Sequence, residues 1–549
     1  MSQPKPALVS QRAAARLPRW ALIVLCAVWT IPGLVGRDPW RNADVTAFGL
    51  MAAMAEGRIS WWSPTLGGVP VDTAVLSHWM GAAFMIALQP WVDPALASRL
   101  PFAVVLAFTM AGVWYATFHL ARTEAALPVA FAFGGEASAV DYARAIADGA
   151  LLALLASLGL LQLGHETTPE VVQLGAATGF IWALARAPFR QVSAQWAVVL
   201  SLAVLSASGA PFCALILGVV GAIVCWRSRY DGARQLAWWA LAAAAFSAGL
   251  GVALNTWAWR FGLSTQPEQW GLILRLWVWF PWPVWPLALW TLWRWRQHWG
   301  KRHLAIPLSL TLTVWVVSTW MGGSDRALML ALPGLAILAA FSLPTLQRAA
   351  ASALDWFSMC FFSAAAAFFW AMYIAMVTGK PQIWADNIRR LAPNFEAPFH
   401  TGTLLLAIGA TAGWLALIRW RTAREPHPLW KSMVLPAGGV ALCWLLLMTL
   451  WLPLLDFARS SRPGIASVKQ WIGAPSCVAA RGMSPAMVAS WEVMTGLTID
   501  ARAQAEAACP VLVQVTRGGQ APAAIAGWEF VGQAQRPTDR NEMVSVYRR

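Results

Sequence analysis

The chain has 549 residues, of which 58% are hydrophobic and only 12% are charged. A typical soluble domain carries about 25% charged residues, so this composition excludes an ordinary soluble protein. The formal net charge is +15, but the positive side chains gather in short segments between apolar runs, without the basic stripe of a nucleic-acid-binding protein.

Apolar runs near the length of about 20 residues that spans a bilayer recur along most of the chain. They predict thirteen spans, at residues 20–36, 98–120, 144–163, 171–187, 194–207, 209–226, 236–254, 270–293, 304–320, 326–343, 355–378, 402–418 and 434–455. Residues 74–91 form a further apolar run. The count of thirteen holds if this run lies in the outer leaflet or dips into it; if it crosses fully, one of the other segments does not cross. Three prolines in the segment 277–286 predict a kinked or broken span.

Basic residues predict the topology. Arg12, Arg16 and Arg19 precede the first apolar run, and no small-residue cleavage site follows it, which predicts a signal anchor with a cytoplasmic N-terminus. By the positive-inside rule, three basic loops are also cytoplasmic. They contain Arg227, Arg229 and Arg234; Arg294, Arg296, Lys301 and Arg302; and Arg419, Arg421, Arg424 and Lys431. Thirteen spans then place the C-terminus outside, in the periplasm of a bacterium.

The predicted fold class is an all-α polytopic membrane protein with a small C-terminal α/β domain. Residues 1–19 form a cytoplasmic segment, residues 20–455 the membrane domain with a first outer loop at 37–74, and residues 456–549 the periplasmic domain. Short β-prone runs near 477–479, 510–515, 528–531 and 543–547 and a helix-like stretch near 484–494 support this division. Cys477 and Cys509 lie in this polar tail, where a disulfide is plausible outside the cytoplasm.

The first outer loop carries the most informative motif. Asp44 heads an amphipathic run and is followed by Gly57, Trp62, Pro64 and Leu66, and then by Leu76 and Trp79. This pattern resembles the GT-C glycosyltransferases, in the branch of the lipid A aminoarabinose transferase and the protein O-mannosyltransferases. The first Asp of the family's motif falls on Asp44. The resemblance implies a multi-helix membrane enzyme that takes a sugar from a polyprenyl-phosphate carrier outside the cytoplasm.

The chain departs from the family pattern at two places. Val45 stands where the family has a second acid, and Asp72-Thr73-Ala74-Val75 replaces its Glu-Lys-Pro-Pro stretch, so the lysine is lost. An ancestral fold with altered or lost activity is therefore an open alternative.

Weaker matches add further candidate residues. Tyr142, Arg144 and Asp148 resemble the family's "YARxxxxD" segment, one residue short, which implies a second catalytic acid at Asp148 near the cavity of Asp44. Arg326 precedes a "LLP"-like helix, and the resemblance implies a contact with the donor phosphate. Arg389 and Arg390, in the loop 380–400, are further candidates for the phosphate.

Physical chemistry supports the same assignment. Sugar transfer from a lipid phosphate needs a carboxylate to accept a hydroxyl proton, and a cation to hold the departing phosphate. We expect Asp44 to be the base, with inversion at the anomeric carbon. We expect no cofactor beyond the lipid-linked donor, and the divalent metal requirement and the acceptor (lipid, glycan or protein) stay open. The alternatives are that Asp44 only caps a helix, that the protein binds lipid-linked glycan or scaffolds envelope assembly without catalysis, or that it is a transporter.

Overall fold

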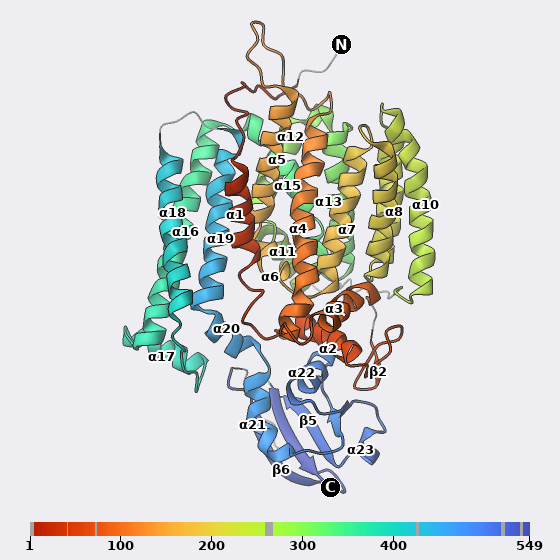
Figure 1. Cartoon of the computed structure of the whole chain (residues 1–549), viewed down its shortest axis with the longest axis vertical. Helices are drawn as coiled ribbons and strands as arrows, with labels where there is room; N and C mark the ends of the chain where they lie inside the picture. Colours follow the sequence, from red (N-terminus) through yellow and green to blue (C-terminus); the bar gives the residue numbers. More distant parts are fainter. Residues whose placement is uncertain are drawn as a thin grey trace. The chain divides into compact units, whose positions relative to one another are not determined.

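The computed structural model describes residues 5–40, 42–71, 74–257, 267–423, 428–517, 522–538 and 542–549. Asp72, Thr73 and Arg424, named above, lie outside the described residues. The described part is mainly helical, with one five-stranded sheet and one short hairpin (Figure 1). The predicted fold class, a helical polytopic protein with a small C-terminal α/β region, is therefore confirmed.

The helices have well-defined bounds. In chain order they are α1 (Arg19–Thr30), α2 (Ala43–Ala55), α3 (Val75–Leu88), α4 (Pro94–Ala121), α5 (Ala139–Ala156), α6 (Leu158–Leu163), α7 (Pro169–Arg186), α8 (Gln191–Ala207), α9 (Pro211–Trp226), α10 (Asp231–Ala253), α11 (Pro267–Trp279), α12 (Val284–Arg294), α13 (Arg302–Trp320), α14 (Asp325–Met329), α15 (Leu332–Ala340), α16 (Arg348–Thr378), α17 (Gln382–Leu391), α18 (Thr401–Thr422), α19 (Val434–Leu450), α20 (Leu452–Arg459), α21 (Arg462–Ile472), α22 (Pro485–Thr495) and α23 (Ala505–Ala508). The strands are β1 (Thr65–Leu66), β2 (Val69–Pro70), β3 (Val478–Arg481), β4 (Ile499–Asp500), β5 (Val511–Arg517), β6 (Glu529–Gln535) and β7 (Glu542–Arg548).

Among the described residues, seven helical segments are long and apolar enough to cross a membrane, or up to eight if the bent pair α11 and α12 is one span. The predicted count of thirteen is not confirmed by length and composition. One reason is that three predicted spans, α1, α8 and α9, form helices of only 12, 17 and 16 residues. The further apolar run forms α3, whose 14 residues rise about 21 Å, short of the roughly 30 Å hydrocarbon core.

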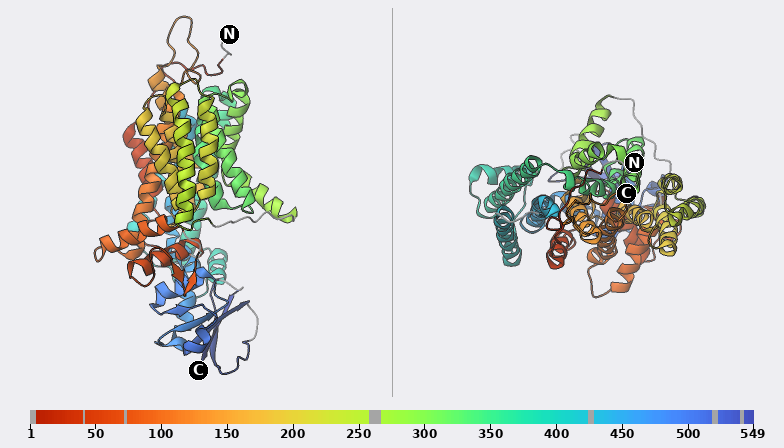
Figure 2. Two further views of the ribbon diagram at one scale, coloured as in Figure 1. Left: turned by 90° about the vertical axis from the view of Figure 1, so that its right-hand side faces the viewer. Right: turned by 90° about the horizontal axis from the view of Figure 1, so that it is seen from above.

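The Trp- and Pro-rich segment breaks its span. α11 and α12 meet at 82° across a break between Trp279 and Val284. A proline within this break cannot donate a backbone hydrogen bond, so a continuous helix is disfavoured there. The predicted kink is therefore confirmed, and α11 projects sideways from its neighbours (Figure 2).

The contacts divide the chain into two compact units. Unit 1 comprises residues 1–32, 102–366 and 407–446, and unit 2 comprises residues 33–101, 367–406 and 447–549. In unit 1, the buried helix α15 packs against α5, α12 and α13, and α8 packs against α7, α9 and α10. Figure 1 shows α7, α8 and α10 together.

Unit 2 contains the terminal sheet, whose strand order is β4-β3-β5-β7-β6. β3 is parallel to β4 and β5, whereas β7 is antiparallel to β5 and β6, and α22 connects β3 to β4. The predicted strands and helix of this region are confirmed; the two-residue β4 was not predicted.

The first outer loop and the terminal domain share one hydrophobic core inside unit 2. Leu50 of α2 and Leu66 of β1 belong to the same buried cluster as Val478, Val511 and Val546 of the sheet. The predicted periplasmic domain from residue 456 therefore packs on the loop that carries Asp44.

Candidate functional site

Asp44 lies in the first turn of α2, where the helix N-terminus stabilises a negative charge. Its Oδ2 accepts a hydrogen bond from the backbone nitrogen of Trp40 at 3.1 Å, and the Nη1 of Arg37 lies 3.5 Å from the same oxygen. The side chains of Asp44 and Arg37 are only 1% and 2% exposed. Asn42, not Asp44, is the N-cap residue of α2, so the simple capping alternative does not describe this carboxylate.

Arg37 is held by more than this ion pair. Its Nε donates to the carbonyl of Gly33 at 2.7 Å, and its guanidinium carbon lies 4.7 Å from the ring centroid of Trp40. Arg99, in α4, donates to the backbone carbonyls of Leu34 at 3.1 Å and of Arg37 at 2.9 Å. Two buried arginines therefore fix the turn that leads into α2.

A pair of carboxylates, Asp38 and Asp456, lies in the same unit as Asp44. The Oδ1 of Asp456, in α20, accepts from the backbone nitrogen of Asp38 at 2.9 Å and from the indole Nε1 of Trp40 at 3.0 Å. Arg462 donates to both carboxylate oxygens of Asp38, at 2.9 and 2.7 Å, and the hydroxyl of Ser460 donates at 2.7 Å. Sequence reasoning missed this cluster because it joins residues more than 400 positions apart.

The two carboxyl groups titrate in opposite directions. Burial raises the pKa of Asp38, but hydrogen bonds from Arg462 and Ser460 and the positive charges of Arg462 and Arg99 outweigh it, so the net shift is downward. Burial and the negative charge of Asp38 raise the pKa of Asp456 despite its hydrogen bond from Trp40. Asp38 is therefore the more firmly ionised of the two.

A polar cavity of about 380 Å³ adjoins this cluster in unit 2. Arg37, Asp38 and Arg462 line one part of it, and Arg58 and Glu492 line another. Arg58 bridges Glu56 at 2.6 Å and Glu492 at 3.4 Å. Cavities of this size hold small ligands, and this mixture of carboxylates and guanidinium groups suits hydroxyl-rich ones.

Gly67 and Trp79, further along the same region, make structural contacts. The backbone carbonyl of Gly67 accepts from the nitrogen of Ala501 at 2.9 Å. Gly67 has φ +55°, and a Cβ there would lie 3.0 Å from that of Ala501 and 3.1 Å from Val488. The indole of Trp79 donates to the carbonyl of Trp61 at 2.7 Å. Gly67 therefore holds the loop against the terminal domain, whereas Trp79 ties α3 to the loop itself.

Arg326 lies at the start of α14 in unit 1. Its Nη2 is 2.5 Å from the carboxylate of Glu166, and its Nη1 donates to the hydroxyl of Thr168 at 3.2 Å. The side chain of Arg326 is 21% exposed, whereas that of Glu166 is 4% exposed. An arginine has five N–H donors, so these contacts leave donors for an anion. Glu166 was not predicted as its partner, because 160 residues separate the two.

An apolar cavity of about 110 Å³ adjoins this arginine within unit 1. It is lined by Ala327, next to Arg326, and by Glu170, and the remaining lining comes mainly from α9, α13 and the segments that flank them. Phe212, Trp257 and Trp320 supply much of its apolar surface. Arg326 itself does not line the cavity; its neighbour Ala327 does.

Asp148 lies elsewhere in unit 1. Its carboxylate accepts from the indole of Trp114 at 2.8 Å and from the backbone nitrogen of Leu17 at 3.2 Å. These contacts join α5 and α4 to the residues that precede α1. In unit 1, Glu166 and not Asp148 is the acid beside Arg326.

Arg389 and Arg390 lie on α17, which carries polar residues on one face. Arg389 pairs with Asp386 at 2.9 Å, with side chains 67% and 54% exposed, and Arg390 donates to Asn387 at 3.1 Å. Neither contacts the carboxylate cluster of unit 2. No group of three or more His, Cys, Asp or Glu side chains that could hold a metal ion occurs among the described residues. A disulfide joins Cys477 to Cys509, with Cα atoms 5.2 Å apart.

Comparisons with known proteins bear on the fold. No family model and no curated protein matches the chain. Two crystal structures of ArnT from Cupriavidus metallidurans match 96% of this chain and 98% of their own, at 13% sequence identity. The TM-score is 0.63 for the structure bound to undecaprenyl phosphate and 0.61 for the apo structure.

The chain has the fold of ArnT. ArnT is the lipid A aminoarabinose transferase of the GT-C superfamily, so the predicted resemblance is confirmed at the level of the fold. The multi-pass membrane architecture is also confirmed. At 13% identity the likeness does not carry the substrates of ArnT over to this chain.

Proposed function

We propose that the protein is a GT-C-type glycosyltransferase of a bacterial inner membrane. It transfers a sugar from a polyprenyl-phosphate carrier to an acceptor on the outer face. The observation that carries this proposal is Arg326, a cation with spare donors beside an apolar cavity, in a chain with the fold of an undecaprenyl-phosphate-binding protein. The N-terminus is cytoplasmic and the terminal domain is periplasmic in this proposal, as the basic loops predict.

In the proposed reaction, an acceptor hydroxyl attacks the anomeric carbon of the sugar. The bond between that carbon and the phosphate oxygen breaks, the polyprenyl phosphate leaves with the electron pair, and the configuration inverts. Asp44 accepts the hydroxyl proton, and the guanidinium of Arg37 lies 3.5 Å from its carboxylate. Because Asp44 is 1% exposed, acceptor binding must displace part of the turn formed by residues 37–40.

Arg326 stabilises the departing phosphate. A guanidinium can bind two phosphate oxygens at once, and charge develops on these oxygens as the glycosidic bond breaks. Before the donor binds, Glu166 pairs with Arg326 and offsets its positive charge, so Glu166 competes with the donor phosphate for the guanidinium. Arg389, Arg390 and Asp148 receive no role, because their contacts serve exposed or structural pairs.

The proposal is tested with purified protein in liposomes that contain undecaprenyl-phosphate aminoarabinose as donor and a bacterial envelope lipid extract as acceptor, with release of undecaprenyl phosphate as the readout. Removal of a general base costs about 10²–10⁴-fold, so we expect Asp44→Asn to lower kcat by that factor. We expect Arg326→Gln to lower kcat/KM by about 10²-fold or more.

Exposed residues provide matched controls. Asp231→Asn and Arg234→Gln alter a pair whose side chains are 91% and 56% exposed, and we expect wild-type rates from both. Full transfer by a folded Asp44→Asn variant would show that the assignment of the base is wrong. Full transfer by Arg326→Gln would remove the phosphate contact from the proposal.

A non-catalytic protein that binds lipid-linked glycan is the second candidate. It is favoured by the enclosure of Asp44 against Arg37 and by Val45, which is 1% exposed and stands at the place of the family's second acid. In that case, the donor binds with an affinity that depends on Arg326, and it is recovered unconsumed after incubation with membrane extract.

A further inference from the structure

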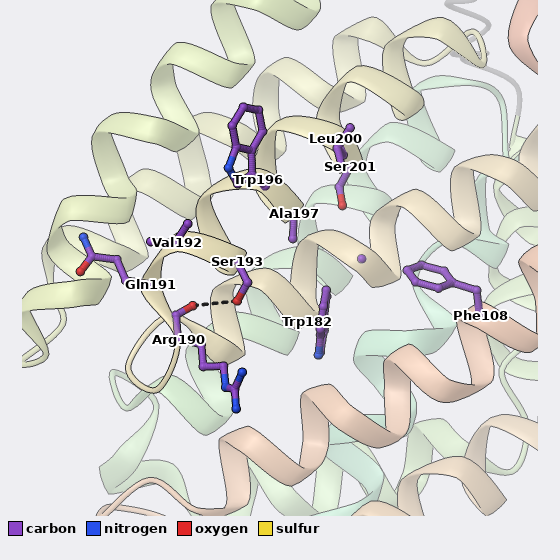
Figure 3. A pocket seen from close by; sticks show the side chains of 11 residues that line it. Phe108, Trp182, Arg190, Gln191, Val192, Ser193, Trp196, Ala197, Leu200 and Ser201 are labelled. Atoms are coloured by element: carbon purple, nitrogen blue, oxygen red, sulfur yellow. Dashed lines mark hydrogen bonds between the residues drawn. The ribbon is translucent and has the colours of Figure 1, made fainter.

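A groove of about 750 Å³ opens on the surface of unit 1, between α4, α7 and α8 (Figure 3). Phe108 comes from α4, Trp182 from α7, and Trp196 and Leu200 from α8. Arg190, immediately before α8, lines one end. The groove therefore has an apolar body and a cationic end, as a single-headed amphiphile requires.

Two further arginines surround that end. The guanidinium carbon of Arg122 lies 4.9 Å from the ring centroid of Phe189, the neighbour of Arg190. The guanidinium carbon of Arg186 lies 4.8 Å from the ring centroid of Trp182, which lines the groove. None of the three arginines forms an ion pair with a carboxylate among the described residues. The nearby Asp231, at the start of α10, pairs with Arg234 at 3.5 Å.

In the protein alone, the positive charges of these three arginines are not balanced by carboxylates among the described residues. An anion placed there gains from all three charges, and hydrocarbon chains beside it gain from contact with the groove. Surface-bound cations attract anionic lipid headgroups in this way. A soluble anion lacks hydrocarbon chains, so it would contact the arginines but not the apolar part of the groove.

The groove is distinct from the proposed donor site. Arg186 ends α7, whereas Thr168, which contacts Arg326, immediately precedes that helix. The 18 residues of α7 rise about 27 Å, close to the thickness of the hydrocarbon core. The three arginines and Arg326 therefore lie near opposite ends of α7.

We propose that this groove binds an anionic glycerophospholipid, with its phosphate at Arg122, Arg186 and Arg190 and one acyl chain along Phe108, Trp182 and Leu200. In the orientation given under the proposed function, this lipid belongs to the cytoplasmic leaflet. Only the assignment of the leaflet depends on that proposed function. The site would hold a lipid against the α4, α7 and α8 face on the side opposite to the donor.

The test is native mass spectrometry of the full chain, released from detergent with equimolar phosphatidylglycerol and phosphatidylcholine of matched chains. We expect wild-type protein to retain phosphatidylglycerol preferentially. A lipid-facing arginine contributes roughly fivefold in affinity, so Arg190→Gln should reduce the preference about fivefold and the triple glutamine variant about hundredfold. Arg190 is exposed and its side chain makes no hydrogen bond among the described residues, so the single variant should fold.

Two controls separate this site from general charge attraction. Arg227→Gln with Arg229→Gln removes two exposed arginines of the same predicted cytoplasmic face and should leave the preference unchanged. Ala197→Phe fills the groove while keeping every charge, and it should weaken retention of both lipids. Equal loss in the Arg227 and Arg229 variant, unchanged retention in Ala197→Phe or in Arg190→Gln, or preferential displacement by undecaprenyl phosphate would each overturn the proposal. Failure of sugar transfer in the earlier assay leaves this result unaffected.

Discussion

The buried pair of Asp44 and Arg37 allows a quantitative test of how the first loop is stabilised. Asp44→Asn removes one negative charge and leaves Arg37, 2% exposed, beside a neutral amide. Breaking a buried ion pair on one side costs about 3–5 kcal/mol, because the remaining charge is desolvated without a partner. The hydrogen bond of Arg37 to Gly33 and its contact with Trp40 remain in the variant, so we expect a loss near 3 kcal/mol.

A double-mutant cycle isolates the pair. Arg37→Met alone removes the guanidinium from beside the buried carboxylate of Asp44, and we expect a similar loss of the free energy of unfolding. The double variant has no buried charge at either position and should be more stable than the sum of the single losses by several kcal/mol.

The assay is chemical unfolding of purified protein in one detergent, followed by tryptophan fluorescence, with Asp231→Asn as the exposed control. If Asp44→Asn unfolds within about 0.5 kcal/mol of wild type, as exposed substitutions do, or if the two losses simply add, the ion pair does not stabilise the loop.

Three further predictions follow from the contacts. The pKa of Asp38 is lowered in the folded state, so Asp38 stabilises the fold above its unfolded pKa, and this stability is lost as the pH falls through the folded pKa. Arg462→Gln should therefore lower the free energy of unfolding at pH 7. It should also make the loss of stability in acid less steep. Glu166→Gln frees Arg326 and should tighten binding of undecaprenyl phosphate in a competition assay. Replacing both cysteines of the terminal-domain disulfide, which closes a loop of 32 residues, should destabilise that domain by roughly 3–4 kcal/mol, measured by protease resistance.

Each of these has a contrary outcome. An acid unfolding curve of unchanged slope in Arg462→Gln would show that Asp38 is stabilised by other groups. Weaker binding of undecaprenyl phosphate to Glu166→Gln would mean that Glu166 positions Arg326 rather than competes for it. Equal protease resistance with and without the cysteines would show that the sheet is stable without its cross-link.

Much of the membrane domain was predictable because apolar length and proline position act locally. The break between α11 and α12 follows from the prolines in the segment 277–286. The number of spans was not predictable in the same way. Helix ends depend on tertiary packing, and runs of adequate apolar length became helices as short as the 12 residues of α1.

The candidate site was predictable only where one residue carried the signal. The first loop pointed to Asp44, and the start of a later helix pointed to Arg326. The ion-pair partners of these two residues could not be predicted from the sequence. Arg37 contacts Asp44 because of the conformation of the intervening turn, which the sequence does not predict. Glu166 pairs with Arg326 although 160 residues separate them in the chain. Asp148 was placed by motif spacing alone; it lies in the middle of α5, where its carboxylate is buried and accepts from Trp114 and Leu17.

The central claim is that the protein moves sugar off a polyprenyl phosphate. The most direct measurement is a single-turnover experiment with excess protein in liposomes, sugar-labelled undecaprenyl-phosphate aminoarabinose and a bacterial envelope lipid extract as acceptor. The account predicts that the label leaves the carrier in wild type and stays on it in a folded Asp44→Asn variant. Label that stays on the carrier in wild type, although the donor is bound, would contradict it.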